Sequence, residues 1–271
     1  MVKHSVTACL LGTAIALLLQ GGTIQDTIHI GNNVRTIYKT ELNLNKVRMR
    51  ISLANEDKPR KHLLDSAETY DSIIQRNKDA FLITNAATQD ANAVRLWGTT
   101  ISYGDLLFAQ CLTRIGTAFN LYADSGTVRV EFVRLWDRVP NYYSTLTSFV
   151  AGPQLMKDGE PYCDPDKEQT YHSQELRTRN IFGYTDNTVL YIITLPYKSS
   201  LDEAIVIARS YNLYNAMCVD DDTLLITEDF KVMPEKNETT HVLSIMTGTE
   251  QKWETIRQRG ISNKGNLLDC Y

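Results

Sequence analysis

Three consecutive carboxylates are the most chemically suggestive feature of the sequence. Asp220, Asp221 and Asp222 lie between two apolar runs, in the stretch NAMCVDDDTLLI that covers residues 215–226. Like charges this close repel each other, by a few kcal/mol per pair at the effective dielectric of a protein surface. A solvated hairpin turn is one explanation, because aspartate is a common turn residue. A functional site is the other.

A divalent cation is one occupant that such a cluster could have, since Ca²⁺ and Mg²⁺ prefer oxygen ligands, and Glu228 and Asp229 follow shortly after. Solvated carboxylates are the simpler interpretation of Asp221 and Asp222, so we predict no metal and no cofactor. The chain has neither a recognisable Ser-His-Asp or Cys-His order nor a glycine loop that would cradle phosphate.

Two helix–strand–loop units carry polar loops to the ends of buried strands. Apolar residues at helical spacing predict a helix from Leu63 to about Asn77, followed by a strand at 80–84 and the loop NAATQD. Ser200 and Glu203 form a capping box, and the helix that they start leads to the strand NAMCV and the three aspartates. Because loops at strand ends are where mixed sheets usually build sites, we expect the two loops to converge.

The remaining pattern is rich in strands. Apolar runs, alternating or continuous, predict strands at 46–54, 127–136, 143–152 and 188–195, with turns at Asp158-Gly159 and Asp186-Asn187. No low-complexity linker and no repeat of fixed period interrupts the chain after residue 25. We therefore predict an α+β fold, in which residues 25–271 form a single domain with one mixed, strand-rich sheet and a few packed helices.

Composition excludes some classes of protein. The chain has 271 residues, of which 43% are hydrophobic and 22% charged, so it can bury a core and is not expected to be disordered. Lys and Arg number 28 against 32 Asp and Glu, and no basic run or basic helix occurs. We predict no nucleic-acid partner, because the sequence lacks the clustered basic residues that bind nucleic acid.

The amino terminus has the pattern of a targeting segment. A short basic start, MVKH, precedes an uncharged apolar stretch of about fourteen residues. Residues 1–22 are therefore predicted to be a signal peptide or a membrane anchor, with a buried N-terminal helix as the alternative. The predicted location is secreted, periplasmic or membrane-anchored.

Five motifs in order carry a resemblance to a known family. They are ITNAATQDANAVRLWGTTISYGDLL (83–107), FVAGPQLMKDGEPY (149–162), RNIFG (179–183), the strand and capped helix of 188–213, and CVDDDTL (218–224). Together they resemble the phosphodiester glycosidase family, typified by the uncovering enzyme, whose bacterial relatives are labelled exopolysaccharide-biosynthesis-like. The resemblance covers roughly residues 45–235 and places family positions on Asn85, Gly98, Arg179 and Asp220.

The resemblance implies a site for a sugar linked through phosphate. The chemistry of each side chain suggests which role it would have in that site. Asp220 would activate water or stabilise an oxocarbenium-like centre. Arg179 would bind the phosphate, because its planar guanidinium group can donate hydrogen bonds to two oxygens at once. Asn85 would hydrogen-bond sugar hydroxyls as donor and acceptor. Each also has an ordinary structural explanation: a turn carboxylate, a strand arginine and a cap residue.

Five more residues are predicted to contact the substrate. Asp222 and Thr223 follow Asp220, Gly98 belongs to the first motif, Arg177 neighbours Arg179, and His172 lies shortly before. Arg177 could take the role of Arg179, and His172 could be structural.

Departures from the family pattern keep a second function open. Ala86, Ala87, Thr88 and Gln89 replace Gly-Gly-Phe-Phe, and Asp221-Asp222-Thr223 replaces a triple glycine. Glycine permits positive φ and close backbone approach to a ligand, which these residues restrict. The predicted function is a hydrolase for a sugar-1-phosphodiester or a related phosphate-linked glycan. The alternative is an inactive derivative that binds a glycan or nucleotide-like ligand or serves as a structural protein.

Overall fold

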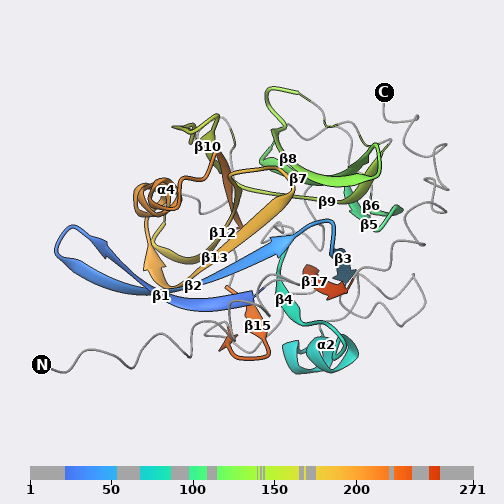
Figure 1. Cartoon of the computed structure of the whole chain (residues 1–271), viewed down its shortest axis with the longest axis horizontal. Helices are drawn as coiled ribbons and strands as arrows, with labels where there is room; N and C mark the ends of the chain where they lie inside the picture. The colour runs from blue at the N-terminus through green and yellow to red at the C-terminus, as the bar shows by residue number, and fades with distance from the viewer. Residues whose placement is uncertain are drawn as a thin grey trace, which may run out of the picture.

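The computed structural model describes residues 22–53, 68–86, 98–108, 115–138, 140, 142, 144–164, 168, 175–219 and 223–233, with the backbone of strand 244–250. These residues form three β-sheets and two helices (Figure 1). Neither described helix is long and apolar enough to cross a membrane. The predicted targeting segment lies almost wholly outside the described residues, and its last residue, Gly22, begins the first strand.

The largest sheet has seven strands in the order β1-β2-β13-β12-β14-β10-β11. The strands are β1 (Gly22–Ile30), β2 (Asn33–Asn43), β13 (Val189–Ser199), β12 (Arg177–Tyr184), β14 (Asn215–Val219), β10 (Gln154–Lys157) and β11 (Glu160–Pro161). Each neighbouring pair is antiparallel. We call this the seven-stranded sheet.

The second sheet, the β4 sheet, has the order β16-β15-β4-β17-β3. Its strands are β16 (Lys231–Val232), β15 (Leu225–Thr227), β4 (Leu82–Asn85), β17 (Ser244–Glu250) and β3 (Val47–Leu53). The third, the β7 sheet, has the order β6-β5-β9-β7-β8. Its strands are β6 (Asp105–Phe108), β5 (Thr100–Ser102), β9 (Thr145–Ala151), β7 (Thr117–Asp124) and β8 (Thr127–Arg134).

One apolar core joins the three sheets. Phe182 of β12 packs edge-on against Phe119 of β7 and Phe149 of β9, with ring centroids 5.7 and 6.0 Å away. Leu82 of β4 and Met49 of β3 belong to the same buried cluster. The sheets are therefore held by a shared interior, and the ends of their strands meet around it.

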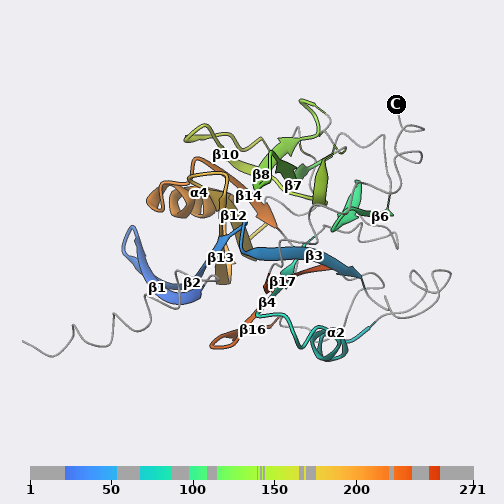
Figure 2. The same cartoon turned by 45° about the vertical axis from the view of Figure 1, so that its right-hand side comes forward.

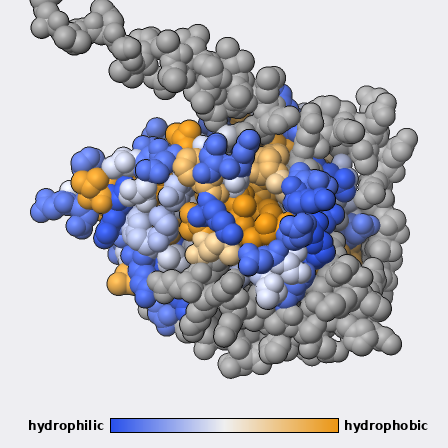
Figure 3. All heavy atoms as spheres, turned by 90° about the horizontal axis from the view of Figure 1, so that it is seen from below, coloured by the Kyte–Doolittle hydropathy of each residue, from blue (hydrophilic) through white to orange (hydrophobic). Residues whose placement is uncertain are grey.

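Each helix covers the outer face of one sheet (Figures 1 and 2). Helix α4 (Leu201–Ser210) buries Ala204, Ile207 and Ala208 against the seven-stranded sheet, and its N-cap, Ser200, accepts a hydrogen bond from the backbone of Glu203. Helix α2 (Tyr70–Arg76) packs with the β4 sheet and leads directly into β4. Seen from below, the molecule shows an apolar patch near the middle of that face (Figure 3).

The predicted elements differ from the structure in two respects. The structure is rich in strands as expected, but the described strands form three antiparallel sheets instead of one mixed sheet, because many neighbouring strands, such as β2 and β13, come from distant parts of the chain. The first helix ends at Asn77 as predicted, yet it begins at Tyr70. Thr69 caps it by accepting a hydrogen bond from the backbone of Ser72, and the predicted start at Leu63 lies outside the described residues.

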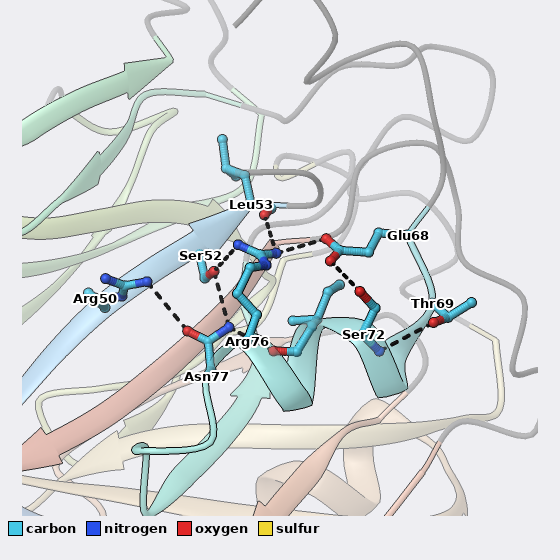
Figure 4. Close-up of polar contacts among 9 residues, drawn as sticks. Arg50, Ser52, Leu53, Glu68, Thr69, Ser72, Arg76 and Asn77 are labelled. Carbon is cyan, nitrogen blue, oxygen red and sulfur yellow. Dashed lines mark hydrogen bonds and ion pairs between the residues drawn. The ribbon is translucent and has the colours of Figure 1, made fainter. Parts of the chain in front are cut away.

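A polar cluster fixes α2 on β3 (Figure 4). The Arg76 guanidinium donates to the carbonyl of Leu53 at 2.9 Å and forms an ion pair with Glu68 at 2.7 Å. Asn77 donates to Ser52 of β3 at 3.3 Å and to the Ile73 carbonyl at 2.8 Å. Because α2 runs straight into β4, these contacts also fix where Asn85 lies.

Replacing Arg76 tests whether this cluster stabilises the fold. Arg76→Ala removes a partly buried ion pair and leaves Glu68 and the Leu53 carbonyl without this partner, so the unfolding free energy should fall by about 2 kcal/mol. Chemical denaturation measures the change. Lys231→Ala is the control, because its 4.0 Å pair with Asp71 is exposed and should contribute less than about 0.5 kcal/mol. Equal losses in both variants would contradict the assignment.

Candidate functional site

Two buried asparagines connect the seven-stranded sheet to the β4 sheet. Asn85 is the last residue of β4 and is 6% exposed, and Asn180 lies in the middle of β12 with no exposed surface. The Asn180 side-chain amide donates to Asn85 Oδ1 at 2.5 Å, to Thr84 Oγ1 at 2.9 Å and to the Leu224 carbonyl at 3.2 Å. We call this group, Thr84, Asn85, Asn180 and Leu224, the amide seam.

The backbone of Leu224 determines how both amides are oriented. Its carbonyl can only accept, so the atom of Asn180 that faces it must be the nitrogen. Its N–H can only donate, so the atom of Asn85 at 3.4 Å must be the oxygen. The two assignments agree with each other, because the Asn180 nitrogen then donates to the Asn85 oxygen. Asn180 Oδ1 therefore points away from all of these partners.

The ends of the chain that flank the three aspartates lie at this seam. Val219, the last residue of β14, pairs with Asn180. Thr223 precedes Leu224 and donates its N–H to Thr178 of β12 at 3.4 Å. Asp220, Asp221 and Asp222 lie outside the described residues, as do 87–89 of the first loop. The described ends of the two loops thus adjoin, whereas a shared site for Asn85 and Asp220 stays a prediction.

Arg179 lies on the other face of β12. Successive strand residues point to opposite faces, so Asn180 shares the core side with Phe182 and Arg179 shares the α4 side with Ile181. The Arg179 guanidinium is fully buried and donates to the Ser199 carbonyl at 3.1 Å and to the Glu175 carbonyl at 2.5 Å. The structure does not bring Arg179 into the amide seam.

The other predicted contacts are spread over the site region. Arg177 is partly exposed and pairs with Glu175 at 3.2 Å. Thr223 is 2% exposed and lies beside β12. His172, like Asp222, lies outside the described residues.

Gly98 and Gly183 have packing reasons to be glycine. Gly98 has φ +67, and a Cβ there would lie 2.2 Å from the side chain of Val150. At Gly183 a Cβ would lie 2.4 Å from Leu213 Cδ1. Both motif glycines therefore allow close approach between elements of the fold, which accounts for their presence without a ligand.

A buried carboxylate fixes the corner next to β14. Glu168 accepts hydrogen bonds from Thr117 Oγ1 at 2.7 Å, from Arg134 Nε at 3.1 Å and from the Gln154 backbone at 3.0 Å. The preceding residue, Pro153, accepts from the Cys218 N–H at 2.8 Å, and Gly152 bridges to Val219. Glu168 thus positions the β9–β10 corner against the end of β14, and burial raises the pKa of its carboxyl to about 7.

Sequence reasoning did not single out Asn180 or Glu168. Asn180 stands one position after Arg179 in the RNIFG motif, where the family pattern has threonine, and strand alternation already put it on the face opposite Arg179. Glu168 has no motif around it. Only the fold brings it to Thr117 and Arg134, at sequence separations of 51 and 34 residues.

Comparison with solved structures identifies the fold. The catalytic domain of zebrafish N-acetylglucosamine-1-phosphodiester alpha-N-acetylglucosaminidase, auto-inhibited by its pro-peptide, matches with a TM-score of 0.64 and 14% identity, over 86% of this chain and 83% of that one. The fold resembles that of this glycosidase domain.

Two bacterial structures match as well. A hypothetical protein from Synechocystis has a TM-score of 0.57 and 11% identity, over 84% of this chain and 62% of that one. A putative exported protein from Burkholderia pseudomallei has a TM-score of 0.56 and 8% identity, over 80% and 74%. No family model and no curated protein matches the sequence. At these identities the likeness shows a distant relationship of fold.

The raised pKa of Glu168 predicts a pH dependence of stability. Its native carboxyl holds a proton that the unfolded chain releases between about pH 4.5 and 7. The stability due to this group is therefore complete below the unfolded value and is lost as the pH rises through about 7. Relative to Glu168→Gln, the wild type should lose up to about 1.4 kcal/mol per pH unit in this range.

Urea denaturation of both proteins from pH 4 to 9 measures this difference. Glu160→Gln removes an exposed carboxylate and serves as the control for the change of net charge. Stability curves of wild type and Glu168→Gln that run parallel across the whole range would contradict the raised pKa.

Proposed function

We propose that the protein is a hydrolase that cleaves a sugar-1-phosphodiester or a related phosphate-linked glycan. The observation that carries the proposal is the amide seam, where buried hydrogen-bonding side chains from two sheets adjoin the residues that flank the three aspartates. The resemblance of fold to a glycosidase that acts on a phosphodiester supports the class of reaction.

In the proposed reaction, water attacks the anomeric carbon while the bond from that carbon to the phosphate oxygen breaks. Asp220 takes the proton of the attacking water, and the phosphate leaves as an anion without needing a strong acid. Asn85 orients the sugar by hydrogen bonds to its hydroxyls. Arg179 stabilises the negative charge on the leaving phosphate.

The two faces of β12 give the phosphate and the sugar different positions in the proposal. The β12–β14 ladder ends, within the described residues, at Asn180 and Val219. We assign the phosphate to the face of β12 that carries Arg179 and the sugar to the face that carries Asn180.

A non-catalytic glycan-binding or nucleotide-binding protein is the second candidate, and one observation favours it. The Arg179 guanidinium already donates to two backbone carbonyls, at Ser199 and Glu175, which leaves fewer donors for a phosphate. The replacement of the family glycines around Asp220 and after Asn85 agrees with this candidate.

The N-terminal sequence completes the proposal. An export signal or membrane tether in residues 1–22 would place the domain outside the cytoplasm, where it could meet a phosphate-linked polysaccharide such as an exopolysaccharide.

Hydrolysis by single variants tests the proposed function. The methyl phosphodiester of N-acetylglucosamine 1-phosphate is the probe, and released reducing sugar is the readout. The wild type should turn over, and Asp220→Ala should lower kcat by at least about 100-fold, because it removes the general base. Its Tm should be nearly unchanged, because a carboxylate at a strand end holds little core.

Glu228→Ala is the matched control, since Glu228 is an exposed carboxylate in the same part of the chain, and it should retain full activity. An inactive wild type, or equal rates for wild type and Asp220→Ala, would reject the hydrolase and favour the non-catalytic candidate.

A further inference from the structure

Among the residues that the structure describes, three buried oxygen atoms at or beside the core side of the seven-stranded sheet lack a hydrogen-bond partner. They are Asn180 Oδ1, Thr194 Oγ1 and Thr223 Oγ1. Asn180 and Thr194 have no exposed surface, and Thr223 is 2% exposed. Buried polar atoms are almost always paired, so each such atom requires a physical explanation.

The three atoms belong to neighbouring positions. Asn180 and Thr194 are directly opposite each other in the β12–β13 ladder, so their side chains lie on the same face and close together. Thr223 is bonded to Leu224, whose carbonyl accepts from the same Asn180 amide. Asn180 and Thr194 therefore share one face of the sheet at the amide seam, and Thr223 adjoins the seam through Leu224.

The orientation of Asn180 shows what this location can bind. The backbone of Leu224 holds the Asn180 nitrogen toward the β4 sheet, which leaves Oδ1 as a pure acceptor. The hydroxyls of Thr194 and Thr223 can each donate or accept. All three side chains are neutral, so the set suits a neutral group that both donates and accepts, such as an alcohol, and lacks the positive charge that a phosphate needs.

We propose that Asn180, Thr194 and Thr223 form a hydroxyl-binding subsite that selects the neutral sugar portion of the ligand. The inference rests on the proposed function for the position of the site, and it adds two residues, Asn180 and Thr194, to those that contact the sugar. Asn180 Oδ1 accepts a hydrogen bond from a sugar hydroxyl, and the oxygen of that hydroxyl accepts one from a threonine.

The segment that closes the subsite is held by long contacts. The N–H of Thr223 lies 3.4 Å from Thr178 Oγ1, and the N–H of Leu224 lies 3.4 Å from Asn85 Oδ1. Both distances exceed the usual 2.7–3.2 Å of an N–H to O hydrogen bond. Thr223 is therefore held to β12 by a weak hydrogen bond, whereas Leu224 is also buried in the cluster under α2.

Binding of neutral monosaccharides to the full chain tests the subsite. Isothermal titration with N-acetylglucosamine, glucose, galactose and mannose should give a saturable isotherm for at least one sugar, and inorganic phosphate alone should not compete with it. Thr194→Val keeps the shape of the side chain and removes one hydrogen bond to the ligand, so the Kd of that sugar should rise about tenfold.

Thr100→Val is the matched control. Thr100 is fully buried in β5 of the β7 sheet, and its hydroxyl also lacks a partner in the structure, so the substitution removes the same group at a different place. Both variants should fold, with a Tm equal to or above that of the wild type, because each loses an unpaired buried hydroxyl. Only Thr194→Val should weaken sugar binding.

The outcomes separate this inference from the proposed hydrolysis. Sugar binding that weakens in Thr194→Val, in a protein that cleaves no phosphodiester, keeps the subsite and rejects the hydrolase. Failure of all four sugars to bind, or wild-type affinity in Thr194→Val, overturns the subsite whether or not hydrolysis occurs.

Discussion

The hydrogen bonds of the Asn180 side chain are the contact on which the arrangement of the site depends. One amide in the seven-stranded sheet donates to the side chains of Thr84 and Asn85 and to the backbone of Leu224, which all belong to the β4 sheet or its connection. The apolar core holds the sheets together but is not directional. The amide contacts supply direction, because hydrogen bonds weaken steeply when donor and acceptor are misaligned, and they bring the end of β4 to the end of β14.

The alternation of β12 then divides the site into two sides with different chemistry. Asn180 and Thr178 lie on the side that faces the β4 sheet, and Arg179 lies on the α4 side with its guanidinium bonded to backbone carbonyls. The proposed function places a neutral hydroxylated group on the first side and an anion on the second. A sugar linked through phosphate has both parts, as the proposed function requires.

Local patterns in the sequence predicted those elements whose structure depends on local interactions. The capping box at Ser200, the helix that follows it, the buried strand before the aspartates and the turn at Asp158-Gly159 are all present, since neighbouring residues determine them. The β1–β2 hairpin was not predicted, because its alternation is weak and it follows a stretch that resembles a targeting segment. The pairing of strands that lie far apart in the sequence cannot be predicted from local patterns. For this reason one sheet was expected, whereas the described strands form three.

The candidate site was predictable in part for the same reason. Strand-end loops indicated Asn85 and the aspartate cluster, and the structure brings the described ends of those loops together at the amide seam. The partners of these residues come from elsewhere in the chain: Asn180 is 95 residues from Asn85, and Thr194 reaches the seam only through the β12–β13 register. No sequence spacing connects such positions, so the residues on the neutral side of the site could be identified only from the structure.

The coupling between Asn85 and Asn180 tests the central claim most directly. A double-mutant cycle with Asn85→Ala, Asn180→Ala and the double variant, followed by urea denaturation, isolates the energy of their interaction from the other contacts of each residue. If the amide seam joins the two sheets, the coupling energy should be at least about 1 kcal/mol, as expected for a buried hydrogen bond with fixed geometry. Losses that add to within about 0.3 kcal/mol would mean that the two asparagines act independently, and would contradict the account.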